Sequence, residues 1–61
     1  MPMFLSKKII KFLTDTGPST KQAIIDDMLT QGGFADMTDY NIDNLYNAGK
    51  LSKAGDDYDV V

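Results

Sequence analysis

The stretch TDYNIDNLYNAGKLSKAGDDYDVV, residues 38–61, decides the fold that this sequence predicts. In its first half, Ile42, Leu45 and Tyr46 recur at the spacing of one face of an α-helix. Gly49 follows this pattern and can take the left-handed conformation that ends many helices. The second half predicts two short strands, at 51–53 and 58–61, around a tight turn at residues 54–57, where small and polar residues gather. We therefore expect a helix that leads into a β-hairpin.

Two further helices are predicted upstream. Ser6 is a suitable N-cap for a helix from Lys7 to about Thr14. Apolar residues fall on one face of this segment, at Leu5, Ile9, Phe12 and Leu13. Gly17 and Pro18 should end it. The sequence thus predicts a first amphipathic helix followed by a break.

The second helix should begin after Ser19 or Thr20, either of which can cap it, and run to about Thr30. Gly32 and Gly33 should end this helix, and residues 34–37 are expected to form a connector. The third helix is then expected to start near Thr38, with the Thr38 hydroxyl as its cap and Asp39 in its first turn. The predicted fold is a small, mostly helical α+β domain covering residues 1–61, with three helices followed by a C-terminal β-hairpin.

Two segments of this chain resemble winged-helix domains, a variant of the helix-turn-helix fold. They are KKIIKFLTDTGPSTKQAII, residues 7–25, and IDNLYNAGKLSKAGDDYDVV, residues 42–61. The resemblance implies that helix three recognises DNA and that the hairpin is the wing, with contacts near Lys53 and Gly55. It also implies a hydrophobic core, formed by Ile9, Leu13, Ile24, Met28, Ile42, Leu45, Leu51, Tyr58 and Val60.

Carried onto helix three, the resemblance implies a recognition face of Tyr40, Asn41, Asn44 and Asn47. An Asn side chain can pair in a bidentate way with adenine, and a Tyr can bond a phosphate or stack on a base. Lys50 and Lys53 are the cations closest to this face in the sequence. We expect DNA binding and transcription regulation through these residues, while an ordinary solvated surface is the alternative for the three Asn.

The charges of the chain favour a different partner. The formal net charge is −3, all nine acidic residues are Asp, all six basic residues are Lys, and Arg is absent. Six of the nine Asp and only two of the six Lys lie in residues 31–61. An acidic face of Asp39, Asp43, Asp56 and Asp57 would suit a basic protein, and could imitate the charge of DNA. An acidic protein-interaction module is therefore the alternative function.

Two other surfaces have open interpretations. Lys7, Lys8 and Lys11 form a basic cluster that would meet phosphate or an acidic protein, or would only keep the surface solvated. Apolar residues outside the core pattern, notably Met3, Phe4 and Phe34, would either complete the core or form a homodimer interface.

The residue types present argue against catalysis. There is no Cys and no His, which excludes disulfides, thiol chemistry and histidine-based acid–base chemistry. No phosphate-binding glycine motif occurs, and we expect neither a metal nor another cofactor. No apolar run approaches the roughly 20 residues that span a bilayer. We expect a cytoplasmic protein that is not an enzyme and does not enter a membrane.

Overall fold

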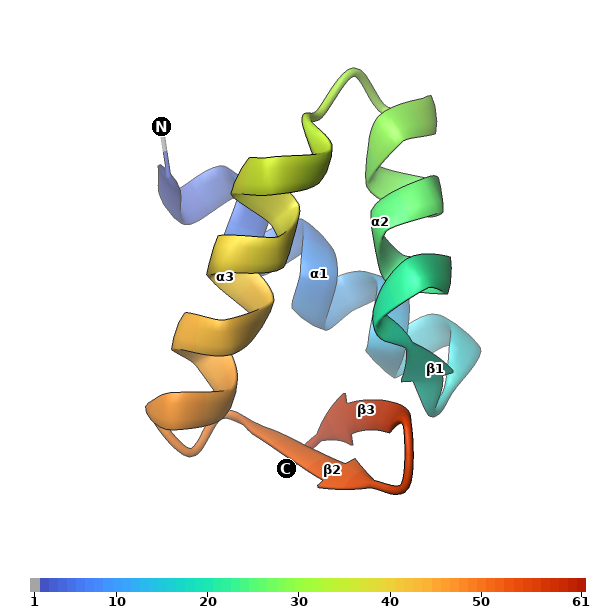
Figure 1. The fold of residues 1–61 in the computed structure, drawn as a ribbon, viewed down its shortest axis with the longest axis vertical. Helices are drawn as coiled ribbons and strands as arrows, with labels where there is room; N and C mark the ends of the chain where they lie inside the picture. The colour runs from blue at the N-terminus through green and yellow to red at the C-terminus, as the bar shows by residue number, and fades with distance from the viewer. Residues whose placement is uncertain (1) are drawn as a thin grey trace.

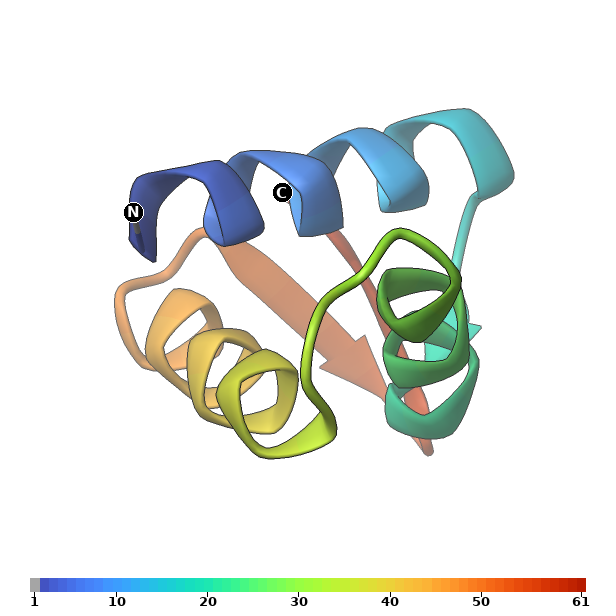
Figure 2. The ribbon, with the colours of Figure 1, turned by 90° about the horizontal axis from the view of Figure 1, so that it is seen from above.

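The computed structural model describes residues 2–61, with side chains from residue 5 onward. It contains three helices, α1 (Pro2–Thr16), α2 (Lys21–Thr30) and α3 (Ala35–Asn47). Three short strands accompany them, β1 (Ser19–Thr20), β2 (Leu51–Ala54) and β3 (Asp57–Val60). Helices α2 and α3 lie side by side, and α1 crosses both on one side of the pair (Figures 1 and 2). The predicted α+β fold, three helices followed by an antiparallel strand pair, is confirmed.

The strands form one antiparallel sheet in the order β1-β3-β2. In its register, Leu51 pairs with Val60, and Ala54 pairs with Asp57. Strand β1, in which Ser19 pairs with Tyr58, was not among the predicted elements. A two-residue strand has no periodic pattern of its own, and it exists here because β3 offers a free edge to the extended backbone that precedes α2.

Helix α1 is longer than predicted at both ends. It begins at Pro2, so the prediction that Ser6 caps the helix was wrong. Proline is tolerated in the first turn, where its missing N–H has no partner to lose. Ser6 instead lies inside the helix, and its hydroxyl donates a hydrogen bond to Oδ1 of Asn41 on α3 at 2.9 Å. The helix ends at Thr16, and the N–H of Gly17 donates to the carbonyl of Leu13.

Helix α3 begins three residues earlier than predicted. Its N-cap is Phe34, which provides no side-chain hydrogen bond, so Thr38 is not the cap and the first turn contains Asp36 rather than Asp39. Thr38 is fully buried, and its hydroxyl donates to the carbonyl oxygen of Phe34 at 2.7 Å. The predicted connector at residues 34–37 is therefore mostly helix. The cap predicted for α2 is confirmed at Thr20, whose Oγ1 accepts from the N–H of Ala23 at 3.1 Å.

The β-hairpin is tighter than predicted. Ala54 and Asp57 pair with each other, which leaves only Gly55 and Asp56 in the loop. Gly55 has a φ of +61°, whereas Asp56 does not have a positive φ. A two-residue loop with a positive φ at its first position matches the type II′ turn, whose twist suits a hairpin. Gly49, with a φ of +76°, ends α3 as expected and directs the chain into β2.

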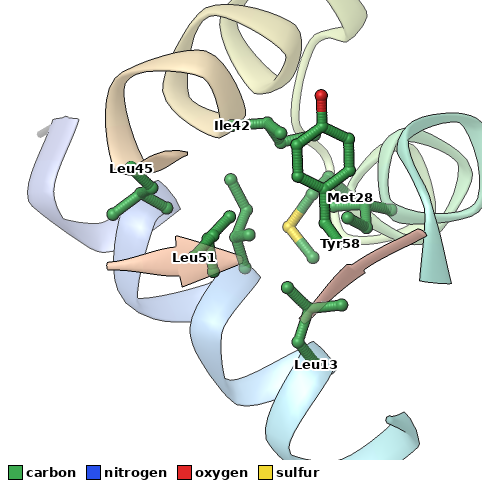
Figure 3. Packing of buried hydrophobic residues seen from close by; sticks show 8 residues of the cluster. Leu13, Met28, Ile42, Leu45, Leu51 and Tyr58 are labelled. Carbon is green, nitrogen blue, oxygen red and sulfur yellow. The ribbon is translucent and has the colours of Figure 1, made fainter. Parts of the chain in front are cut away.

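The core lies where the three helices meet the hairpin (Figure 3). Eight of the nine predicted core residues are buried, namely Ile9, Leu13, Ile24, Met28, Ile42, Leu45, Leu51 and Tyr58. The ninth, Val60, is half-buried and packs against this cluster. Because α3 and the hairpin both contribute to the core, their outer surfaces hold a defined position relative to each other. No helix within residues 2–61 is long and apolar enough to cross a membrane.

Candidate nucleic-acid interface

The outer face of α3 is polar and exposed. Tyr40 is 67% exposed, and Asn44 and Asn47 are also exposed. These three positions, spaced i, i+4 and i+7, lie on one face of a helix. The opposite face carries Thr38, Ile42 and Leu45, which are buried. The structure therefore places Tyr40, Asn44 and Asn47 together on an accessible surface, as predicted.

Asn41 does not belong to this surface, which corrects the predicted recognition face. It is only 7% exposed, because its position on the helix falls next to the buried stripe. Its Oδ1 accepts the hydrogen bond from Ser6, and its Nδ2 donates to the carbonyl oxygen of Met37 at 2.8 Å. Asn41 therefore joins α3 to α1 and is not available to a ligand.

The acidic residues Asp39 and Asp43 of α3 share one lysine from α2. Nζ of Lys21 lies 2.8 Å from Oδ1 of Asp39 and 2.9 Å from Oδ1 of Asp43. Hydrogen bonds to Asp39 and then to Asp43 raise the pKa of Lys21 above its ordinary value. The lysine stays charged and offsets half of the negative charge of the pair. Sequence analysis missed this arrangement, because Lys21 and Asp43 are 22 residues apart and no local pattern connects them.

The same lysine connects the helices to the hairpin through Tyr58. Nζ of Lys21 lies 5.9 Å from the centre of the Tyr58 ring, and Nζ of Lys53 lies 5.3 Å from it. Tyr46 meets this ring edge to face, with ring centres 6.0 Å apart. Cations at such distances are attracted to the ring face. The start of α2 and strand β2 are thus held near each other around one aromatic ring.

A hollow of about 420 Å³ lies between the start of α2 and the hairpin. It is lined by Thr20, Lys21, Gln22, Lys53, Asp56 and Tyr58. Lys53 takes part in no ion pair within residues 5–61, and it is exposed beside Asp56. Lys50 is exposed just after α3, and Asp57 is exposed beside the hairpin loop. The hairpin therefore presents one lysine and two carboxylates to solvent, and Lys50 adds a second lysine just before it.

The basic cluster belongs to α1, which crosses α2 and α3 on one side of the pair (Figure 2). Lys7, Lys8 and Lys11 are exposed, and Lys11 forms an ion pair with Asp15 at 2.8 Å. The i, i+4 spacing of Lys11 and Asp15 explains this pair.

The proposed dimer residues are only partly placed by the structure. Phe34 is 67% exposed, at the turn before α3, and Met37 is 48% exposed. The side chains of Met3 and Phe4 lie outside the described residues. Phe34 and Met37 line a shallow hollow with Leu5. In the part of the chain with described side chains, no group of three possible metal ligands comes together.

Comparisons with known proteins found no matching family, no matching curated protein and no matching solved structure. The function must therefore be argued from the outer face of α3 and the adjacent hairpin.

Proposed function

We propose that this protein is a small DNA-binding regulator that inserts α3 into the major groove and places its hairpin on the DNA backbone. One observation carries the proposal. On the outer face of α3, Tyr40, Asn44 and Asn47 are exposed and are not part of the buried core. The major groove is wide enough for one α-helix, and amide side chains match the donors and acceptors of base edges. Lys50, which follows α3, and Lys53, on β2, would supply phosphate contacts.

The carboxylates of α3 would repel the phosphates of DNA, but ion pairs with Lys21 offset part of their negative charge. Lys21 holds both Asp39 and Asp43, so the three residues together carry a single negative charge. Few free cations remain near the interface, so binding should depend weakly on salt. With two or three phosphate contacts, the slope of log K against log salt would be about −2 to −3.

The test is an amide-shift NMR titration with a mixed-sequence DNA duplex at low salt. The proposal expects shifts that cluster on residues 38–48 and on the hairpin, with little change at residues 7–11 of α1. An absence of shifts at millimolar-scale DNA would refute the proposal. Shifts confined to the α1 lysines would also refute it, because these residues belong to neither α3 nor the hairpin.

The second candidate is an acidic module that binds a basic protein. The observation in its favour is that exposed carboxylates gather on α3 and the hairpin, in a chain with a net charge of −3; they are Asp36, Asp43, Asp56 and Asp57. Replacing Asp39 and Asp43 together with Asn separates the two functions by the sign of the effect. It should strengthen DNA binding, because Lys21 is released and two negative charges disappear. It should weaken binding to a basic protein.

A matched control uses Asp26 and Asp27 on α2. Replacing both with Asn changes the net charge of the protein by the same amount, on α2 and not on α3 or the hairpin. A DNA affinity that rises equally in the two double variants would show an effect of net charge alone. A larger rise for the Asp39 and Asp43 variant would locate the interface at α3.

A further inference from the structure

The outer face of α3 lacks the cations that select guanine. Arg is absent from the chain, and α3 contains no Lys. Arg or Lys bonded to O6 and N7 is the commonest specific contact to guanine. Lys21 is engaged by two carboxylates, while Lys50 and Lys53 lie beyond the end of the helix. The groups left to contact base edges are therefore mainly amides.

Asn44 and Asn47 are placed to contact neighbouring bases. Both are exposed, and their side-chain amides form no hydrogen bond to any other described residue. A spacing of three residues corresponds to a rise of about 4.5 Å along a helix, close to the spacing of about 3.4 Å between base pairs. In each amide the NH2 group can donate to N7 of adenine while the carbonyl oxygen accepts from N6, which makes a bidentate pair.

The outer face of α3 also offers a contact to thymine, the partner of adenine. Tyr40, one turn before Asn44, offers an apolar ring edge for the methyl group of thymine.

From this arrangement we infer that the interface selects A·T base pairs in the major groove, with Asn44 and Asn47 as the residues that determine specificity. The inference rests on the proposed function, since it concerns the same face of α3.

The test compares three duplexes of equal length, one containing A·T pairs, one G·C pairs and one I·C pairs in the central site. Inosine presents the same N7 and O6 acceptors as guanine in the major groove, but it lacks the N2 amino group in the minor groove. Binding is measured by fluorescence anisotropy at low salt, with the unmodified protein, Asn44→Ala, Asn47→Ala and Gln31→Ala. Gln31 is an exposed amide on the far end of α2 and serves as the matched control.

The expected result is tighter binding to the A·T duplex than to both others, by at least about five-fold, as one good bidentate contact provides. Asn44→Ala and Asn47→Ala should each reduce this preference, and Gln31→Ala should keep it. Equal affinity for all three duplexes, or a preference for G·C, would overturn the inference and leave the proposed function intact. Equal affinity for A·T and I·C, with weaker G·C binding, would also overturn it, because the minor groove would then be the recognised surface. Binding to none of the three would refute the proposed function itself.

Discussion

Replacing Asn41 with Ala tests whether this residue supports the fold or contacts a ligand. Asn41 is 7% exposed and links α3 to α1 through the Ser6 hydroxyl at 2.9 Å, and it also bonds the carbonyl oxygen of Met37 at 2.8 Å. The variant loses both hydrogen bonds and leaves the partly buried Ser6 hydroxyl without its acceptor. At about 1 kcal/mol for each bond, the free energy of unfolding should fall by about 2 kcal/mol.

The loss can be measured by urea denaturation followed by circular dichroism. In a domain of this size, 2 kcal/mol also corresponds to a decrease in Tm of roughly 8–16 °C. Asn44→Ala is the matched control, because it makes the same chemical change at an exposed position of the same helix. It should change the free energy of unfolding by no more than about 0.5 kcal/mol.

A double-mutant cycle isolates the contact between the helices. Ser6→Ala, Asn41→Ala and the combined variant should reveal a coupling energy of at least about 0.5 kcal/mol, because the two side chains are in direct contact. The reasoning is refuted if Asn41→Ala and Asn44→Ala cost the same, or if the effects of Ser6→Ala and Asn41→Ala simply add.

Three further variants test other parts of the fold. Gly55→Ala forces a φ of +61° on a residue with a Cβ, so the hairpin should lose about 1 kcal/mol, measured as the change in unfolding free energy. Ile24→Ala, at a fully buried site, should lower the free energy of unfolding by about 2–5 kcal/mol, which is enough to unfold much of the protein in so small a domain. Leu29→Ala, at a side chain that is 47% exposed, should have little effect in the same denaturation assay. The hydrogen bond to Asp39 raises the pKa of Lys21 in the folded protein above its ordinary value of 10.5. The charged Lys21 therefore stabilises the fold fully below pH 10.5, and this stabilisation is lost as the pH rises through the higher folded-state pKa. Lys21→Met should remove that part of the alkaline loss, which denaturation curves at several pH values would detect.

The positions of the core residues follow from the sequence alone. The core that the winged-helix resemblance implies contains all eight buried residues, including Ile9 and Leu13 on α1 and Ile42 and Leu45 on α3. This is possible because a helix with a 3.6-residue repeat must turn its apolar stripe toward the interior. Gly49 ended α3 where expected, since the left-handed conformation at that position is a local property of the chain.

The element boundaries were less predictable, because more than one residue could cap each helix. Ser6 and Thr38 have the side chains of N-caps, yet both lie inside helices and bond to other partners. Their local preference for a cap was outweighed by packing. Strand β1 also depended on tertiary structure, because it pairs with β3, which is far from it in the sequence.

Within the candidate interface, the sequence determined which residue types face outward, and the tertiary structure decided which of them are free. Tyr40, Asn44 and Asn47 are exposed because their helical positions oppose the buried stripe. Asn41 differs from Asn44 only in its angle around the same helix, and that angle places it against Ser6 of α1. Lys21 meets Asp39 and Asp43 only because α2 packs beside α3. Ion pairs and hydrogen bonds between residues far apart in the sequence depend on how the helices pack. No local sequence pattern specifies that packing.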